Sequence, residues 1–188
     1  MSGGPVAAGV LFVCTGNRCR SPMAEALLRS HLAERRADLR SSSAGFAADG
    51  LPPPPEVVQV MRDIGLDVAA HRSRRVRPAT LEGFDLVVAM TRQHLAELTV
   101  MAPPAWARCY TFADLLRRAE ATGGRGEGEA LTAWSRRVHA GRTRSGVLAL
   151  PPSDDVADPI GKKLREYQKA RDLLAGMTLR LADLLAPA

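Results

Sequence analysis

The chain has 188 residues, of which 46% are hydrophobic and 24% charged, a composition typical of one globular domain. Its longest apolar runs, 10–14 and 86–90, have five residues each, so we expect no segment that spans a membrane. The formal charge of +6 suits an anionic partner, but the basic residues are scattered and few aromatic residues could stack on bases, which disfavours nucleic acid.

The chain has three cysteines, Cys14, Cys19 and Cys109, and no Cys-x-x-Cys pair. A disulfide scaffold needs more cysteines and usually an even number of them. The sequence therefore predicts a reducing compartment and no metal or other cofactor. Residues 1–9 contain no Lys or Arg and no long apolar stretch, which is not typical of a secretory signal. We therefore expect a cytoplasmic protein.

Strands and helices alternate in the first half of the chain. A run of β-forming residues predicts a buried strand at 10–13, and Ser21 and Pro22 have the residue types that cap and begin a helix. The next strand, at 39–44, is expected from the alternation alone, because its serines have low strand propensity. An amphipathic helix should follow, with a buried face formed by Val57, Val60, Met61 and Ile64.

The second half continues the alternation. Residues 84–90 predict another buried strand, which leads into a helix from Thr91. A shorter strand at 107–111 should lead into a further helix, with Thr111 as its capping residue. The longest helix comes last, because apolar residues recur every three or four positions between residues 164 and 184.

Residues 120–152 interrupt this pattern. The stretch 123–128 is rich in glycine and charged residues, and only 130–138 has weak helical character. We therefore predict a single doubly wound α/β domain over residues 1–188, with a four-stranded parallel sheet flanked by helices and a flexible basic insertion at about 120–152. Such folds bind ligands at the carboxyl ends of their strands.

The most informative segment is Cys14-Thr15-Gly16-Asn17-Arg18-Cys19-Arg20-Ser21, which joins the end of the first strand to a helix. Successive backbone N–H groups in such a turn, together with the helix N-terminus, form a site for a tetrahedral oxyanion. Arg20 can donate two parallel hydrogen bonds to phosphate oxygens. The same positive field stabilises a thiolate, so Cys14 is the candidate nucleophile. The candidate phosphate-binding residues are Thr15, Gly16, Asn17, Arg18, Cys19 and Ser21.

This segment and the Pro22-Met23-Ala24-Glu25 that follows resemble the phosphate loop and first helix of the low-molecular-weight protein tyrosine phosphatases. The segments His71-Arg72-Ser73-Arg74, Asp85 to Thr91 and Asp158-Pro159 resemble further parts of the family in the same order. The resemblance covers nearly the whole chain apart from the insertion. It implies a phosphate loop after the first strand, braced by Asn17, and a two-step hydrolysis through a cysteinyl phosphate.

Cleavage of a phosphate monoester also requires a proton for the leaving oxygen, and Asp154, Asp155 and Asp158 are the candidate donors. Asp158 precedes Pro159, which favours an extended backbone, and the resemblance implies that the family's catalytic Asp-Pro stands here. Asp155 remains the alternative. Ser21 is either a hydrogen-bond donor to the Cys14 thiolate, as the resemblance implies, or only a helix cap.

The other two cysteines have different expected roles. Cys19 lies five residues after Cys14 on the same loop, so we expect it to trap a sulfenic acid at Cys14 as a disulfide, unless it only packs inside the loop. Cys109 is expected to be a buried core thiol. The arsenate reductases of this fold also resemble the chain, but they need further cysteines after the third strand, where residues 91–108 have none.

Arg18 and Ile160 stand at the two positions expected to contact the leaving group. In family members that act on phosphotyrosine the first is commonly apolar and the second aromatic, whereas protein-arginine phosphatases that share Cys-Thr-Gly-Asn have Thr at the first. An Arg18 guanidinium facing the pocket would repel phosphoarginine and favour phosphotyrosine, or it points to solvent. We therefore predict a phosphatase acting on phosphotyrosine in proteins. The alternatives are a protein-arginine phosphatase, an arsenate reductase-like enzyme and a non-catalytic phosphate-binding module.

Overall fold

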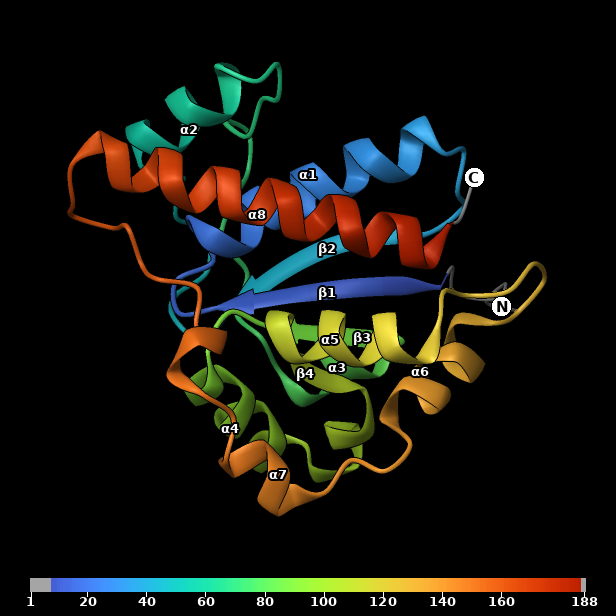
Figure 1. Cartoon of the computed structure of the whole chain (residues 1–188). Helices are drawn as coiled ribbons and strands as arrows, with labels where there is room; N and C mark the ends of the chain where they lie inside the picture. Colours follow the sequence, from blue (N-terminus) through green and yellow to red (C-terminus); the bar gives the residue numbers. More distant parts are fainter. Residues whose placement is uncertain (1–7, 187–188) are drawn as a thin grey trace, which may run out of the picture.

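The computed structural model describes residues 8–186, apart from the side chain of Leu148, so most of the N-terminal stretch discussed above lies outside the described residues. Its four strands are β1 (Gly9–Cys14), β2 (Arg40–Gly45), β3 (Leu86–Ala89) and β4 (Cys109–Thr111). They form one parallel sheet in the order β2-β1-β3-β4 (Figure 1), which confirms the predicted four-stranded parallel sheet and its doubly wound α/β class.

Helices connect and cover the strands, and two short 3-10 turns lie at Pro103–Arg108 and Pro152–Asp154. The helices are α1 (Arg20–Glu34), α2 (Pro55–Arg62), α3 (Pro78–Glu82), α4 (Arg92–Met101), α5 (Phe112–Thr122), α6 (Leu131–His139), α7 (Arg144–Leu148) and α8 (Leu164–Leu185). No helix in the part of the chain that the structure describes has both the length and the apolar character to cross a membrane.

The sheet has an apolar core on each face, because side chains alternate along each strand. Val10 and Phe12 of β1 belong to the core shared with α1, α5 and α8, whereas Leu11 and Val13 belong to the core shared with α3 and α4. Helix α8 packs against both α1 and α5, as the expected long final helix (Figure 1). From β1 the chain runs first to β2 on one side and then to β3 on the other, so the carboxyl ends of β1 and β3 form the topological switch point at which such folds bind ligands.

Three predicted boundaries are wrong, and one of them is that of β3, which spans only Leu86–Ala89 of the expected 84–90. The α2 helix ends at Arg62, because Gly65 adopts a left-handed conformation (φ +79°) in the turn that follows. Ile64 therefore leaves the helix and is 42% exposed instead of joining the buried face. The last strand is also shorter than expected, since residues 103–108 form a 3-10 turn led by two prolines and pairing starts only at Cys109.

The segment 120–152, expected to be flexible, contains helices α6 and α7 and contributes to the core. Leu131, Trp134 and Val138 are buried, and the Trp134 indole donates to the Gly123 carbonyl at 2.9 Å. Arg142 is also buried, where it donates to the Cys109 carbonyl at the start of β4 and lies over the Tyr110 ring. These three apolar residues have the i, i+3, i+7 spacing of a helix, although a run rich in glycine precedes them. That the segment is an insertion relative to the family stays a prediction.

Candidate active site

Cys14 is the last residue of β1, and α1 begins six residues later at Arg20. The 14–20 loop between them therefore lies at the carboxyl end of the sheet, at the topological switch point between β1 and β3. Cys14 is 2% exposed. Its thiol thus lies at the floor of the loop rather than on the surface.

Asn17 gives the loop its shape. Its backbone is left-handed, with φ of +49°, a conformation that asparagine tolerates better than most residues. The side-chain Nδ2 donates to Ser21 Oγ at 3.0 Å and to Ser43 Oγ at 2.8 Å, while Oδ1 accepts from the Arg74 backbone N–H at 2.8 Å. The Asn17 carbonyl accepts from His71 Nε2 at 2.7 Å. The loop is thereby tied to three other segments.

Gly45, the last residue of β2, is required by the close approach of the same loop. A Cβ at this position would stand 2.6 Å from the Asn17 backbone nitrogen and 2.8 Å from the Cys14 and Thr15 carbonyl oxygens. All three are backbone atoms, so no side-chain rotation could relieve the clash. The end of β2 and the loop can therefore touch only through a glycine.

The Ser21 hydroxyl serves Cys14 rather than the helix end. Its Oγ lies 3.0 Å from Cys14 Sγ, accepts from Asn17 and can also reach the Ala44 carbonyl at 3.3 Å. The N-cap of α1 is Cys19, with no side-chain capping bond, so the interpretation of Ser21 as a helix cap is wrong. Since its Oγ already accepts from Asn17, its one proton is free to point at a Cys14 thiolate.

The backbone of the loop provides donors for an anion. Within the described residues 8–186, no backbone N–H of residues 15–19 donates to another protein group. The 15-residue helix α1 begins directly after them and adds its N-terminal partial charge. Unpaired N–H groups next to a helix N-terminus bind tetrahedral oxyanions, and Cys14 precedes them.

Arg20 is the cation of the site and is almost entirely buried, with 5% of its side chain exposed. Its Nη1 donates to the Val156 carbonyl at 3.0 Å, and its Nη2 donates to Asp158 Oδ2 at 2.6 Å and to Thr15 Oγ1 at 3.3 Å. Buried charges are costly unless paired, so these contacts hold the guanidinium at one position.

Asp158 stands on a loop that is fastened at both ends. The Val156 N–H donates to the Met90 carbonyl just after β3, and the Gly161 N–H donates to the Tyr167 hydroxyl at 3.1 Å. Between these anchors the Asp158 carboxylate faces Arg20 and is 42% exposed. It is thus held next to the anion site and partly open to solvent.

The other two candidate acids are engaged elsewhere. Asp154 is buried and pairs with both terminal nitrogens of Arg117, at 2.6 and 2.7 Å. Asp155 accepts from the backbone N–H of Arg92 at 2.7 Å and pairs with its guanidinium at 3.3 Å. Of the three, only Asp158 contacts Arg20.

The sequence of this chain matches a known family over most of the described fold. The family model for low molecular weight phosphotyrosine protein phosphatases matches residues 9–123, which include the 14–20 loop. The chain belongs to this family of enzymes. A protein-arginine-phosphatase of Geobacillus stearothermophilus is 30% identical over 177 residues, covering 94% of this chain and 95% of that relative.

Two further relatives of this phosphatase show the range of the family. An arsenate reductase of Bacillus licheniformis is 35% identical over 113 residues, covering 60% of this chain and 77% of the relative. The crystal structure of a low molecular weight protein tyrosine phosphatase from T. tengcongensis superposes with a TM-score of 0.71 at 31% identity, covering 95% of this chain and 100% of that one.

His94 is a site residue that the sequence analysis missed. It is 5% exposed on α4, and its Nε2 lies 2.9 Å from Thr15 Oγ1. Since the Thr15 oxygen accepts from Arg20, its proton goes to His94, which requires a neutral imidazole with the proton on Nδ1. Burial and the nearby Arg20 guanidinium lower the pKa of His94 to about 4, which keeps it neutral.

Ser43 and Glu25 also support the phosphatase loop from outside it. The Ser43 hydroxyl accepts from Asn17 and donates to Glu25 Oε2 at 2.5 Å, so a chain of hydrogen bonds runs from Cys14 through Ser21 and Asn17 to a carboxylate. Glu25 belongs to the recognised motif, but the run of serines at 41–43 indicated only a weak strand. No local pattern assigned a role to Ser43.

Arg18 lies at the rim of the loop and is half-buried, with its Nε donating to the Pro52 carbonyl at 2.7 Å. Its guanidinium is therefore fastened to the segment after β2. Cys19 and Cys109 are both buried free thiols. Burial raises the pKa of Cys109 to about 12, and burial together with the neighbouring Cys14 raises the pKa of Cys19 further, so neither is a thiolate near neutral pH.

Cys14 and Cys19 are not bonded to each other here, and a disulfide between them after oxidation stays a prediction. The described residues contain no group of three or more His, Cys, Asp or Glu side chains placed to hold a metal ion.

The lowered pKa of His94 predicts how stability depends on pH. In the unfolded chain His94 takes up a proton near pH 6.5, whereas in the folded chain it does so only near pH 4. The free energy of unfolding should therefore fall as the pH drops from 6.5 to 4, by up to about 1.4 kcal/mol per pH unit from this group. Urea unfolding of His94→Gln across this range should give a shallower dependence than the parent protein.

His31→Gln is the control for this measurement, because His31 lies on α1 beside Glu34 and away from the loop. Equal pH slopes for the parent, His94→Gln and His31→Gln would contradict the assignment of a neutral buried His94.

Proposed function

We propose that this phosphatase hydrolyses phosphotyrosine in proteins by a two-step transfer through a cysteinyl phosphate on Cys14. The observation that carries the proposal is the position of Arg20, whose guanidinium touches both the loop after Cys14 and the carboxylate of Asp158. A nucleophile and an acid must stand on opposite sides of the phosphorus atom, and Arg20 joins the two segments that carry them.

Binding of the phosphate exchanges one partner of Arg20. The anionic ester occupies the unpaired N–H groups of residues 15–19 and takes over the Nη2 donor that Asp158 holds in the free enzyme. The second nitrogen, Nη1, keeps its bond to the Val156 carbonyl, so the guanidinium does not move away. Asp158, no longer paired with a cation and next to an anion, carries a proton in this complex.

The first chemical step transfers the phosphoryl group to sulfur. The Cys14 thiolate attacks phosphorus in line, the S–P bond forms, and the bond from phosphorus to the leaving oxygen breaks. Asp158 donates its proton to that oxygen, so the alcohol leaves neutral. Arg20 and the loop N–H groups stabilise the charge on the equatorial oxygens.

The second step returns the enzyme to its starting state. Asp158, now ionised, accepts a proton from water as the water oxygen attacks phosphorus, and the P–S bond breaks. Cys14 leaves as a thiolate and receives a hydrogen bond from Ser21, whose hydroxyl lies 3.0 Å away. Asn17 and Ser43 keep that hydroxyl in place.

Arg18 supports phosphotyrosine as the substrate. Its guanidinium is held at the rim by Pro52, where it adds positive charge beside the leaving group. A cationic phosphoarginine side chain would be repelled there, whereas an aromatic ring can stack on a guanidinium. Phosphoarginine is the second candidate, because the relative from Geobacillus stearothermophilus that covers nearly the whole chain is a protein-arginine-phosphatase. Arsenate reduction is the less favoured alternative, since residues 91–108 hold none of the further cysteines that such reductases need after the third strand.

We also infer a cytoplasmic location, where a thiolate nucleophile stays reduced. All three cysteines are free, and Cys19 lies buried on the same short loop as Cys14. A sulfenic acid formed on Cys14 by peroxide would be trapped by Cys19 with loss of water, giving a disulfide that thiols can reverse.

Cys14→Ser should abolish hydrolysis of para-nitrophenyl phosphate yet leave vanadate or phosphate binding measurable, because the loop N–H groups and Arg20 remain. Loss of an activated nucleophile typically costs several decades in kcat. Steady-state kinetics and calorimetric anion binding test this together. Residual activity above about 1% of the parent would refute the nucleophile, and absence of turnover in the parent enzyme would favour a non-catalytic phosphate-binding module.

Asp158→Ala should slow hydrolysis about 100-fold for phenyl phosphate and much less for para-nitrophenyl phosphate, because a good leaving group needs less protonation. The dependence of kcat on leaving-group pKa measures this directly. Asp155→Ala serves as the matched control, since Asp155 pairs with Arg92 outside the loop. A steeper leaving-group dependence in Asp155→Ala than in Asp158→Ala would show that the acid is misassigned.

Arg18→Thr should shift the ratio of kcat/KM for matched phosphotyrosine and phosphoarginine peptides toward phosphoarginine, because it removes the positive charge at the rim. Faster hydrolysis of phosphoarginine than of phosphotyrosine peptides by the parent enzyme would overturn the substrate assignment and leave the phosphatase chemistry intact.

A further inference from the structure

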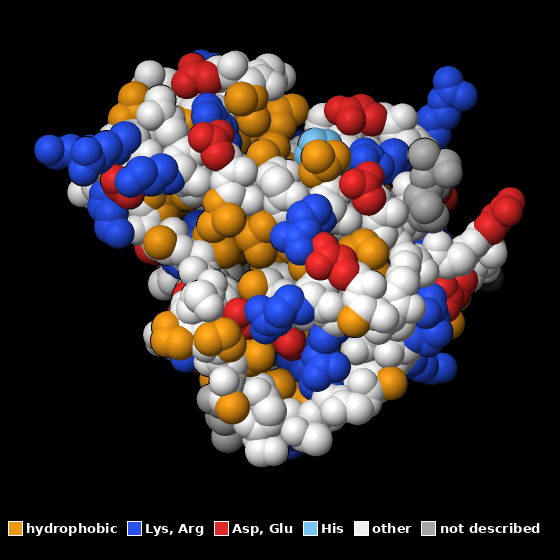
Figure 2. Space-filling model, in the orientation of Figure 1, with side chains coloured by type: hydrophobic (Ala, Val, Ile, Leu, Met, Phe, Trp, Pro, Cys, Tyr) orange, Lys and Arg blue, Asp and Glu red, His pale blue; other side chains and the backbone are white. Residues whose placement is uncertain are grey.

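A cluster of cations follows residues 156–161, the loop that carries Asp158 and that we call the acid loop, and this cluster has no role in the reaction described above. All three lysines of the chain lie within eight residues of each other, although 23 of its 26 basic residues are arginine. We call these three lysines and the one arginine among them the lysine cluster. Its four side chains are all exposed: Lys162, Lys163, Arg165 and Lys169. Figure 2 shows basic side chains gathered where α8 begins.

The lysine cluster carries excess positive charge. Glu166 is the single acidic residue among residues 161–169, and it pairs with both Arg165 and Lys169 at 3.1 Å. Lys162 and Lys163 have no ion pair with any residue in the described range 8–186. Asp158 does not offset them, because its carboxylate is already matched by Arg20.

The position of the cluster is unfavourable for the helix itself. Lys163 is the N-cap of the 22-residue helix α8 and makes no side-chain capping bond, and Lys162 and Arg165 flank it. The N-terminus of a helix carries partial positive charge, so cations there reduce helix stability. Helix formation therefore gives no reason for this placement, whereas an anion brought to the same spot would be favoured by both the side chains and the helix.

The cluster is held next to the catalytic acid. The Lys162 N–H donates to the Pro159 carbonyl at 2.9 Å, and the Gly161 N–H donates to Tyr167 in the first turn of α8. These bonds close a tight turn between Asp158 and Lys162. The lysines are thus positioned at the rim of the site rather than on a separate surface.

A hollow of about 130 Å³ separates the acid loop from α8 at this point. Asp158 and Pro159 of the acid loop and Lys162 just after it line the hollow, together with Glu166, Lys169 and the 50% exposed Leu173 of α8. Since Glu166 pairs with Lys169, Lys162 is the cation of this wall that has no ion pair within the described range 8–186. The hollow is smaller than the ~300–1,000 Å³ pockets of small-molecule ligands. It suits one side chain with a short apolar stem and a negative end.

We propose that this hollow is a subsite for an acidic side chain, aspartate or glutamate, that lies close to the phosphorylated residue in the protein substrate. This proposal rests on the proposed phosphatase function and specifies which phosphoproteins the enzyme selects. A peptide in extended conformation advances ~3.3 Å per residue, so an acid within a few positions of the phosphorylated residue can reach Lys162. The contact is solvent-exposed, so its strength falls with salt.

The test compares phosphotyrosine peptides that differ only by glutamate or glutamine at positions −3 to +3, one position at a time. At low ionic strength the parent enzyme should prefer glutamate by about five-fold in kcat/KM at one or two neighbouring positions, as expected for one or two exposed ion pairs. The preference should disappear in 0.5 M salt, where the Debye length is only a few ångströms. In the double variant Lys162→Gln/Lys163→Gln the ratio should fall to about one.

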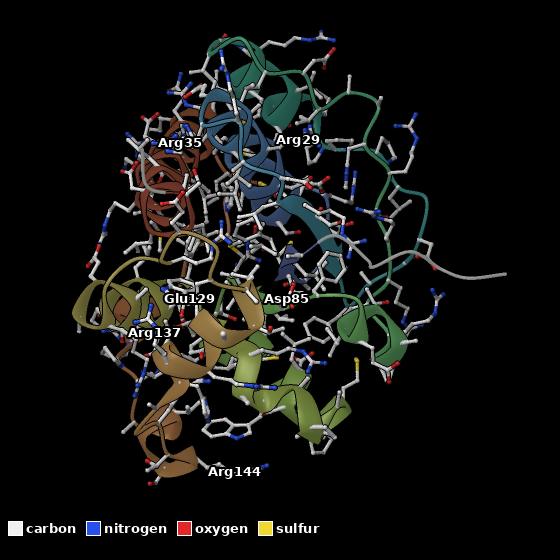
Figure 3. All side chains as sticks on the ribbon, turned by 90° about the vertical axis from the view of Figure 1, so that its right-hand side faces the viewer. Arg29, Arg35, Asp85, Glu129, Arg137 and Arg144 are labelled. Atoms are coloured by element: carbon white, nitrogen blue, oxygen red, sulfur yellow. The ribbon has the colours of Figure 1, made fainter. Side chains whose placement is uncertain are left out.

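Arg136→Gln is the matched control. Arg136 is an exposed arginine of α6, at the other end of the molecule from the start of α8 (Figure 1), and its neighbour Arg137 is labelled in Figure 3. It should keep the parent preference. Para-nitrophenyl phosphate has no flanking residues that could contact the lysine cluster. The double variant and Arg136→Gln should therefore both hydrolyse it within about two-fold of the parent rate.

A parent enzyme that hydrolyses all the peptides without preferring glutamate, or a preference that survives in Lys162→Gln/Lys163→Gln, would overturn the subsite and leave the phosphatase intact. Absence of hydrolysis of every substrate would instead overturn the proposed function. Preference for a second phosphate over glutamate at the same positions would also refute the assignment to carboxylates.

Discussion

Asn17 has a left-handed backbone in the middle of the 14–20 loop. Both polar atoms of its side chain form hydrogen bonds, and their partners are Ser21, Ser43 and the Arg74 backbone. The amide donates to two serines and accepts from a backbone N–H, so its orientation is determined by its partners. These bonds keep the loop N–H groups unpaired with the rest of the protein and hold the Ser21 hydroxyl beside Cys14.

Arg20 connects this loop to the segment that carries Val156 and Asp158. Buried guanidinium groups need several partners, and here the Val156 carbonyl, Asp158 and Thr15 supply them. Only the Asp158 contact involves an acid that is open to solvent. A phosphate can therefore replace that one partner while the others keep the cation in place. His94 belongs to the same arrangement, because a neutral imidazole lets Thr15 accept from Arg20.

Agreement between sequence and structure is closest where a short segment has strong local preferences. The apolar run at 10–13 and the turn that follows it predicted β1 and the loop, and the periodic apolar residues predicted α8. The errors have physical causes. Ile64 leaves α2 because Gly65 turns the chain, and the Ser21 hydroxyl, expected to cap α1, is bonded to Asn17 and lies beside Cys14. Residues 131–138 showed only weak helical character in the sequence, because their helix is stabilised by the burial of Trp134, which depends on packing rather than on helix propensity.

The sequence by itself determined the chemistry at one end of one strand, because Cys14, Arg20 and the turn between them are neighbours in the chain and act through local geometry. The tertiary structure decided which distant groups complete the site. Ser43, Arg74 and His94 lie 26 to 79 residues from their partners in the loop. Asp158, which the resemblance to the family already favoured, is also the one of the three candidate carboxylates that meets Arg20. Hydrogen bonds across such separations depend on how strands and helices pack, and no local pattern of residues encodes them.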